Sequence, residues 1–238
     1  MAGRRILATS GGFVPTERWG VVRPGLVADA LRLTGQDRPR ITFLLTASGD
    51  APGYLAQMYD AMRGWSCDVA HLALFAQPNA DPRELLLGSD VVWVGGGSVA
   101  NLLAVWRVHG LDDLFREAWE AGVVLSGVSA GSICWHVGGP TDSFGPTLAP
   151  VTDALGLLPY GNGVHYDVEA QRRPLLHRLV ADGVLPTSYA TDDGVGIRYE
   201  DTEPVAVLTE RPDGSGAAYR VELSGGRVVE TRLEPGRL

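Results

Sequence analysis

The chain has 238 residues, of which 45% are hydrophobic and 20% charged, so it can bury a large apolar core. Its formal net charge is −8, which argues against a general role on nucleic acid or on an anionic membrane, because both need a basic surface. The two cysteines, Cys67 and Cys134, exclude a scaffold built on disulfides, and we expect both to be buried thiols.

No segment of the sequence has the pattern of an export signal or a membrane span. The first residues lead directly into the apolar residues Ile6 and Leu7, which leaves no room for the apolar core of a signal peptide. No apolar run approaches the length that crosses a bilayer. We therefore expect a cytoplasmic protein that does not bind membranes.

Short apolar runs alternate with amphipathic stretches over the first two thirds of the chain. Strands are predicted over residues 5–10, 41–46, 68–75, 90–94 and 123–126. Helices are predicted over residues 21–33, 54–63, 100–108 and 111–121. This rhythm predicts an α/β fold, a doubly wound and mostly parallel sheet flanked by helices on both faces.

The last third has a different pattern. Short strands are predicted over residues 188–190, 195–199, 205–209 and 217–223, separated by Gly, Pro and Asp. They suggest antiparallel hairpins added at one side of the sheet. Residues 141–159, rich in Pro, Gly and Thr, are expected to form a long loop. With no linker or repeat, we expect residues 1–238 to form a single α/β domain.

The segment after the fifth predicted strand carries a candidate nucleophile. Gly127-Val128-Ser129-Ala130-Gly131 has the Gly-x-Ser-x-Gly pattern. A serine on a sharp turn from strand to helix needs small neighbours, which let the chain turn without clashes. Its hydroxyl then projects at the N-terminus of the next helix, where free N–H groups favour developing negative charge. The alternative is a tight structural turn, because the bare pattern also arises by chance.

Four motifs stand at characteristic spacings along the chain: Val92-Trp93-Val94-Gly95-Gly96-Gly97, Gly127-Val128-Ser129-Ala130-Gly131-Ser132, Gly163-Val164-His165-Tyr166 and Thr191-Asp192-Asp193-Gly194. Together they resemble the motifs of the aspartyl dipeptidase (peptidase E) and cyanophycinase family of serine peptidases. The resemblance runs over roughly residues 6–199. It implies a fold related to class I glutamine amidotransferases, and the chain length suits a dipeptidase better than the longer cyanophycinases.

The resemblance implies a catalytic triad. Ser129 would attack the scissile carbonyl, and His165 would act as general base and acid. Asp193 stands where the family has a glutamate, one methylene longer, so Asp192 and Asp142 remain alternative acids. Each of the three could instead form an Asx turn beside glycine.

An oxyanion hole and a substrate anchor complete the expected site. Backbone N–H groups of Ala130 and of Gly96 or Gly97 would bind the oxyanion, with Gly97 preferred, while Ser98 replaces the family's usual asparagine. Arg172 or Arg173 would hold an aspartate side chain of the substrate, unless they are a solvated helix start. Tyr166 would line the pocket.

We therefore expect a serine-type dipeptidase that hydrolyses short peptides, with N-terminal Asp preferred. The alternatives are a hydrolase of another small amide or ester, and a non-catalytic binding protein of the same fold. The glycine run lacks the spacing of a nucleotide-binding motif, and no cluster has metal-ligand spacing, so no cofactor or metal is expected. The expected partner is a small peptide, with the protein a monomer or homodimer.

Overall fold

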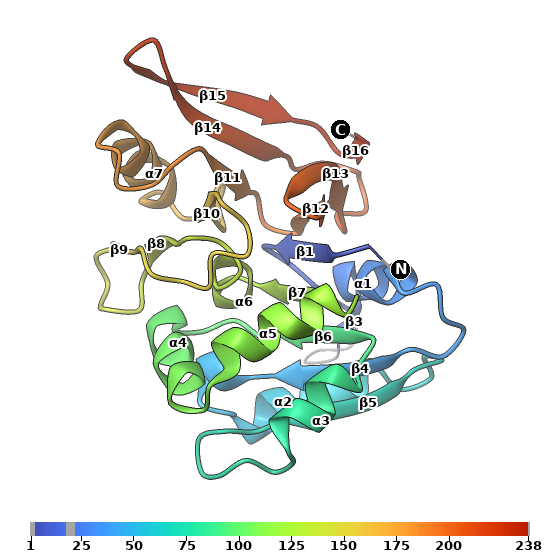
Figure 1. Ribbon diagram of the computed structural model, residues 1–238. Coiled ribbons are helices and arrows are strands. Elements are labelled where there is room, and N and C mark those ends of the chain that lie inside the picture. Colours follow the sequence, from blue (N-terminus) through green and yellow to red (C-terminus); the bar gives the residue numbers. More distant parts are fainter. Residues whose placement is uncertain (1–2, 18–21, 238) are drawn as a thin grey trace.

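The computed structural model describes residues 3–17 and 22–237. Its centre is an eight-stranded sheet with the order β16-β13-β12-β1-β7-β6-β4-β5 (Figure 1). The parallel strands are β1 (Arg5–Thr9), β4 (Arg40–Leu44), β5 (Asp68–Leu72), β6 (Val91–Val94) and β7 (Val124–Val128). Three antiparallel strands extend the edge at β1: β12 (Val195–Glu200), β13 (Glu203–Thr209) and β16 (Gly236–Arg237).

Helices cover both faces of this sheet. The helices are α1 (Leu26–Leu33), α2 (Pro52–Ala61), α3 (Pro82–Leu87), α4 (Val99–Val108), α5 (Leu111–Glu120), α6 (Ala130–Ile133) and α7 (Arg172–Ala181), with a 3-10 turn at Thr46–Ser48. Successive side chains of a strand point to opposite faces, so Val92 and Val94 pack with α4 and α5, whereas Val91 and Trp93 pack with α1 and α2. The central strands are therefore buried on both sides.

A second sheet lies beyond the antiparallel edge of the first. It has the order β10-β11-β14-β15, from β10 (Gly161–Gly163), β11 (Ser188–Thr191), β14 (Ala218–Ser224) and β15 (Arg227–Leu233). Leu176 and Val180 of α7 pack on it with Ala190 and Val221 (Figure 1). Two small hairpins complete the fold, β2 (Phe13–Pro15) with β3 (Val22–Pro24) and β8 (Gly139–Thr141) with β9 (Ala149–Val151).

The predicted fold class is confirmed, and three details differ from the expectation. Residue 21, the first of the predicted helix 21–33, lies outside the described residues, and residues 22–24 form β3, because Gly25 separates them from α1. The expected loop 141–159 contains β9. The predicted strands at residues 188–190 and 217–223 form the second sheet, because β11 pairs with β10 and β14 instead of extending the first sheet.

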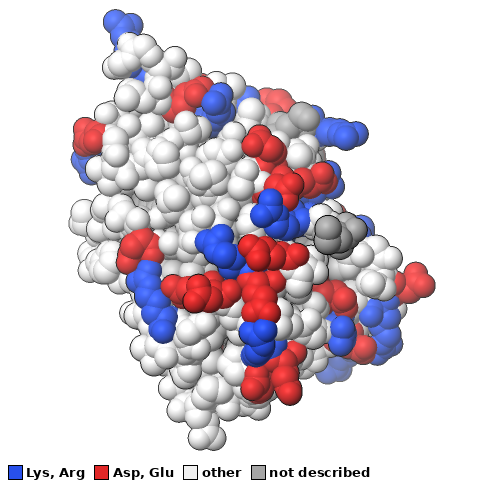
Figure 2. Space-filling model, viewed as in Figure 1, with Lys and Arg blue, Asp and Glu red and all other residues white. Residues whose placement is uncertain are grey.

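In Figure 2 acidic and basic residues lie side by side on the surface. Ion pairs such as Arg83–Glu117 join exposed side chains of opposite charge. No helix within residues 3–17 and 22–237 combines the length and apolar character that a bilayer crossing requires.

Candidate active site

The serine of the Gly-x-Ser-x-Gly motif lies at the sharp turn between β7 and α6. Ser129 has φ 57° and ψ −112°, a region that residues with a side chain rarely adopt. Its backbone N–H donates to the carbonyl of Thr9 at 3.0 Å, and α6 begins at the next residue, Ala130. The strained residue is thus held between a neighbouring strand and a helix start, with its side chain partly exposed.

The two motif glycines are required by close packing. A Cβ on Gly127 would lie 2.5 Å from the carbonyl oxygen of Gly131 and 2.6 Å from that of Val94. A Cβ on Gly131 would lie 2.2 Å from the same Val94 oxygen. Any larger residue at either position would push the turn away from β6, so the pattern has a steric cause here.

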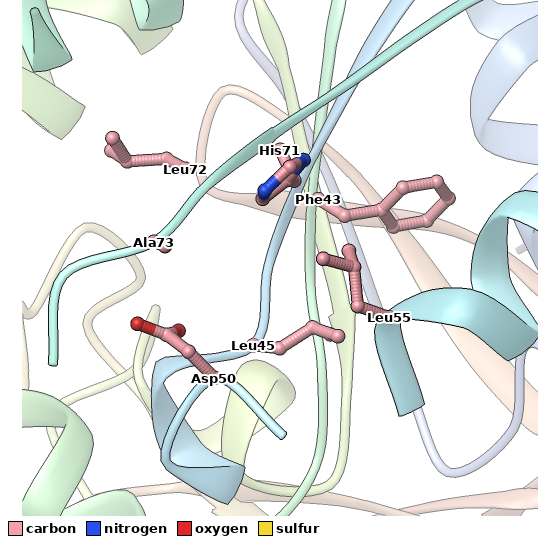
Figure 3. A pocket seen from close by; sticks show the side chains of 7 residues that line it. All are labelled: Phe43, Leu45, Asp50, Leu55, His71, Leu72 and Ala73. Atoms are coloured by element: carbon pink, nitrogen blue, oxygen red, sulfur yellow. The ribbon is translucent and has the colours of Figure 1, made fainter. Parts of the chain in front are cut away.

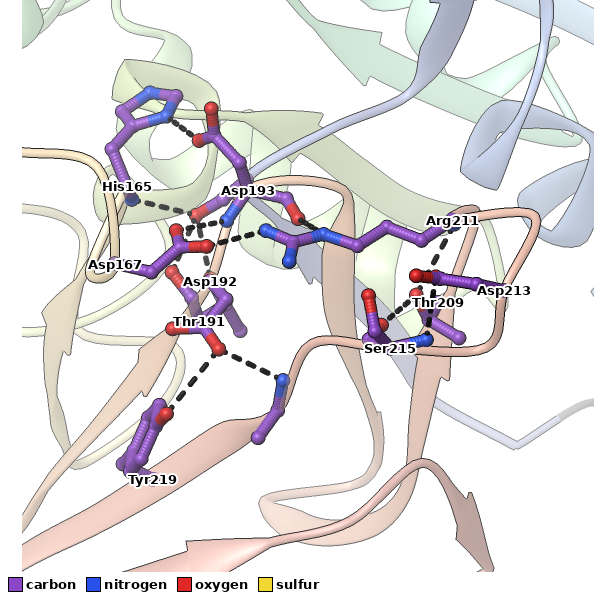
Figure 4. A network of polar contacts seen from close by, with 12 residues as sticks. His165, Asp167, Thr191, Asp192, Asp193, Thr209, Arg211, Asp213, Ser215 and Tyr219 are labelled. Carbon is purple, nitrogen blue, oxygen red and sulfur yellow. Dashed lines mark hydrogen bonds and ion pairs between the residues drawn. The ribbon is translucent and has the colours of Figure 1, made fainter.

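His165 follows β10 and faces the same side of the molecule as Ser129. Its Nδ1 lies 2.5 Å from Oδ1 of Asp193 (Figure 4). Since a carboxylate accepts and does not donate, this contact places a proton on Nδ1 and leaves Nε2 free to take one. No direct hydrogen bond joins His165 and Ser129 among the described residues, as is common in sites without substrate.

Both side chains line one cavity of about 310 Å³. The other lining residues, which define the Ser129 cavity together with these two, are Gly97, Ser98, Asp142, Ser143, Glu169 and Arg172. The lining is mostly polar and comes from the ends of β6, β7, β8 and β10 and from the start of α7. A small polar molecule could meet serine, histidine and backbone N–H groups here at once.

The two alternative acids occupy other surroundings. Asp192 is 4% exposed, and its Oδ2 accepts from the N–H of Ala217 at 3.0 Å and from the Tyr219 hydroxyl at 3.3 Å. Burial raises the pKa of Asp192, against the effect of the Ala217 N–H. Asp142 is exposed on the wall of the Ser129 cavity. Only Asp193 of the three is hydrogen-bonded to His165.

Gly97 and Ala130 lie beside Ser129. Gly97 has φ +135°, and a Cβ there would lie 2.3 Å from the carbonyl oxygen of Ala47, so this position also demands glycine. A Cβ on the preceding Gly96 would lie 3.4 Å from Cβ of Ser129. Among the hydrogen bonds of the described residues, none uses the N–H of Gly97 or of Ala130. Both N–H groups are therefore available to a bound oxygen.

The two arginines at the start of α7 point in different directions. The side chain of Arg172 is 3% exposed, donates to Glu169 and to the carbonyl of Pro140 at 2.7 Å each, and borders the Ser129 cavity. Successive helical residues are about 100° apart, so Arg173 faces elsewhere.

Arg173 and Tyr166 belong to a separate cluster. The Arg173 guanidinium lies 4.6 Å from the ring centres of Tyr166 and of Tyr219 and bonds to Glu230 at 3.0 Å. Tyr166 is 3% exposed and donates its hydroxyl to Glu230. Neither residue lines the Ser129 cavity, and Glu230 accepts hydrogen bonds from Nη1 of Arg173 and from the hydroxyl of Tyr166.

A smaller hollow lies beside β4 and β5, lined by Phe43, Leu45 and Leu55 among others (Figure 3). Its volume of about 30 Å³ admits little more than a water molecule. Cys67 and Cys134 are both free and buried, as the sequence predicts, and burial raises the pKa of the Cys134 thiol. Within the described residues, no group of three or more His, Cys, Asp and Glu could hold a metal ion.

Three residues that support the site escaped the sequence analysis. Ser10 accepts a hydrogen bond from the N–H of His165 at 3.0 Å. Asp167 and Arg211 bond to the backbone of Asp193. For Ser10, the position at the end of the first strand was an available signal, whereas a lone arginine in a loop after β13 carries none.

Comparison with known proteins points to one family. The model of peptidase family S51 matches residues 6–207. The chain is 40% identical over 204 residues to the uncharacterized peptidase YgaJ of Bacillus subtilis (strain 168), covering 85% of this chain and 86% of that protein. It is 32% identical over 114 residues to Peptidase E of Shewanella amazonensis, covering 48% and 47% of the two chains. The crystal structure of a peptidase from an acI-B1 Actinobacterium superposes with TM-score 0.73 at 15% identity, over 99% of this chain and 97% of that one, which shows a shared fold.

Proposed function

The chain belongs to peptidase family S51 and is a peptidase, and we propose that it is a serine peptidase of short peptides with Ser129 as its nucleophile. One observation carries the proposal. His165 is bonded through Nδ1 to Asp193, and its ring shares a cavity with Ser129, which stands on a strained turn. A positioned base beside a strained serine is the arrangement that activates a hydroxyl for attack.

The reaction follows from these positions. The Ser129 Oγ attacks the peptide carbonyl carbon while His165 Nε2 takes the hydroxyl proton. The oxyanion that forms accepts hydrogen bonds from the N–H groups of Gly97 and Ala130. His165 then gives its proton to the leaving amine as the C–N bond breaks. Water, deprotonated by His165, then attacks the acyl carbon, the bond from that carbon to Oγ of Ser129 breaks as His165 returns the proton to Oγ, and the carboxylic acid product leaves. Asp193 stabilises the imidazolium in both steps.

The cavity favours a short substrate. Its volume of about 310 Å³ is at the lower end of small-molecule sites. The β8–β9 hairpin borders it at Asp142 and Ser143, and the start of α7 borders it at Glu169 and Arg172. A dipeptide fits such dimensions better than an extended chain.

Arg172 is the candidate anchor for an acidic N-terminal residue. A guanidinium that is nearly buried and borders the cavity suits a carboxylate, and a charge-assisted bond contributes about 1.5–3 kcal/mol. Glu169 already neutralises part of this charge. Preference for N-terminal Asp thus depends on whether Arg172 keeps a free N–H for the substrate.

Digestion of a dipeptide library, followed by mass spectrometry, tests the proposal. The wild type should cleave a subset of dipeptides, and Ser129→Ala should lower kcat by at least about 10³-fold. The matched control is Ser126→Ala. Ser126 lies in β7, the strand that leads to Ser129, and its buried hydroxyl bonds to the carbonyl of Val92. Cleavage of small esters or other amides in place of dipeptides would favour the broader hydrolase. Turnover by neither protein would favour a binding protein of this fold.

A further inference from the structure

Two charged side chains outside the Ser129 cavity hold the turn that carries Asp193. Asp167 Oδ1 accepts from the N–H of Asp193 at 2.9 Å, and Arg211 Nε donates to the carbonyl of Asp193 at 2.7 Å. A third hydrogen bond joins the two side chains to each other, because Arg211 Nη2 donates to Asp167 Oδ2 at 2.5 Å (Figure 4). Both polar groups of the Asp193 backbone are therefore fixed by one ion pair, which we name the Asp167–Arg211 clamp.

The clamp joins three separate segments of the chain. Asp167 lies two residues after His165, Asp193 lies between β11 and β12, and Arg211 lies just after β13. The segment with His165 thus contacts the Asp193 turn twice, through the imidazole and through Asp167. A movement of either segment would break both contacts together.

The clamp residues lie apart from the substrate. Neither Asp167 nor Arg211 lines the Ser129 cavity. Each side chain is 29% exposed, so the pair is only partly shielded from water. Burial raises the pKa of Asp167, but hydrogen bonds from Arg211 and from the N–H of Asp193 lower it more, so that carboxylate is ionised at neutral pH.

The short side chain of Asp193 makes backbone position decisive. An aspartate has two rotatable bonds, so its carboxylate can follow a displaced backbone only a little before the contact to His165 is lost. A displacement of about 1 Å in a catalytic group can lower the rate by about a hundredfold. Arg211 lies beyond residues 6–207, the part of the chain that matches the family model.

We propose that Asp167 and Arg211 are positioning residues, which hold the Asp193 turn so that the carboxylate stays on His165; this rests on the proposed function of the three residues Ser129, His165 and Asp193. The clamp acts through Asp193 alone, without contact to substrate. It should therefore affect the rate of the chemical step and leave substrate binding almost unchanged.

Steady-state kinetics on the best dipeptide of the wild type provide the test. Arg211→Ala should lower kcat by about ten- to a hundredfold with KM changed less than about threefold, and Asp167→Asn should do the same. Arg211→Lys, which keeps the charge and can reach one of the two acceptors, should give an intermediate kcat. The matched control is Arg220→Ala, which removes another arginine of one ion pair, with Glu222, and should leave kcat unchanged. A rise in KM without a loss of kcat would overturn the inference.

A double mutant separates positioning from general destabilisation. In an Asp193→Ala background, Arg211→Ala should lower kcat by less than about twofold, because the residue through which it acts is gone. An undiminished loss in that background would overturn the inference. The proton NMR spectrum gives an independent readout: the far-downfield His165 Nδ1–H resonance of the wild type should weaken or move upfield in Arg211→Ala and persist in Arg220→Ala.

Failure of the clamp and failure of the proposed function give different results. Full activity of Ser129→Ala would remove the proposed serine mechanism. An inactive Ser129→Ala together with wild-type kcat in Arg211→Ala would leave that mechanism standing and overturn the clamp alone.

Discussion

The backbone N–H of His165 donates a hydrogen bond to the hydroxyl of Ser10 at 3.0 Å. Ser10 follows β1 in the first sheet, and its Oγ also lies 2.6 Å from Oγ1 of Thr191, the last residue of β11 in the second sheet. His165 itself has φ +52°, an unfavourable backbone conformation that needs support. One buried serine therefore links the two sheets at the histidine.

Removing that link should slow the enzyme. Ser10→Ala is expected to lower kcat by about tenfold and the free energy of unfolding by about 1–3 kcal/mol, because the N–H of His165 loses its acceptor. Kinetics and urea unfolding measure the two effects. Ser89→Ala is the control, since that serine is similarly buried and bonds to Thr42 and to the carbonyl of Leu85. It should lose stability alone, and an equal loss of kcat in both variants would refute a specific role for Ser10.

The three candidate acids make separable predictions. Asp193→Asn should lower kcat by about 10³–10⁴-fold at neutral pH, because it favours the wrong tautomer of His165 and removes the partner of the imidazolium. Asp142→Asn and Asp192→Asn should each lower kcat by less than about tenfold, since neither contacts His165. If Asp142→Asn were the most damaging of the three, the acid would have been misassigned.

The parallel half of the fold was predictable because its signals are local. Continuous apolar runs such as Val91–Val94 indicate strands buried on both faces, and turn residues mark their ends. The second sheet was not predictable. Whether the strand at residues 188–191 pairs with β12 or with β10 depends on long-range packing against α7, and β10 itself is only Gly161–Gly163. That the chain forms one domain stays a prediction.

The candidate site also contains residues that the sequence predicts and residues that it does not. Ser129 and its glycines were visible because a steric demand fixes the residue types. Arg172 and Arg173 looked equivalent in sequence, yet helix geometry turns only the first to the cavity. The contacts of Arg211 join positions 18 and 44 residues apart, and no local pattern encodes them.

The difference between the arginines can be tested with substrates. With Asp-Leu, Asn-Leu and Ala-Leu, Arg172→Ala should reduce a preference for Asp in kcat/KM by about ten- to a hundredfold. Arg173→Ala, whose side chain packs between Tyr166 and Tyr219, is the control and should keep that preference. Glu169→Gln should strengthen it, since Arg172 loses its competing carboxylate. Equal wild-type rates on all three dipeptides would remove the aspartyl specificity.

A buried histidine just after α6 predicts that the stability of the fold falls in acid. His136 is fully buried, and burial lowers its pKa from the ordinary 6.5 to about 4. The folded state disfavours the charged form of His136, so the contribution of this group to the free energy of unfolding is complete above about pH 6.5. It is lost as the pH falls through about 4, and the loss amounts to about 3 kcal/mol.

Urea unfolding between pH 7 and pH 4 measures this loss. His136→Asn keeps a donor for the carbonyl of Ser132, to which Nδ1 now bonds, and removes the titration. Its stability should fall less steeply with pH than that of the wild type. His109→Asn, at the half-buried end of α4, should retain the wild-type slope. A slope unaltered by His136→Asn would show that other groups cause the acid loss.

Labelling with a fluorophosphonate, located by peptide mass spectrometry, tests the central claim most directly, because it needs no knowledge of the substrate. The reagent forms a stable bond only with a serine that a neighbouring base activates. The account predicts a single adduct on Ser129, absent in Ser129→Ala and formed at least about a hundredfold more slowly in His165→Ala. An unlabelled Ser129 in a protein that still cleaves dipeptides would contradict it.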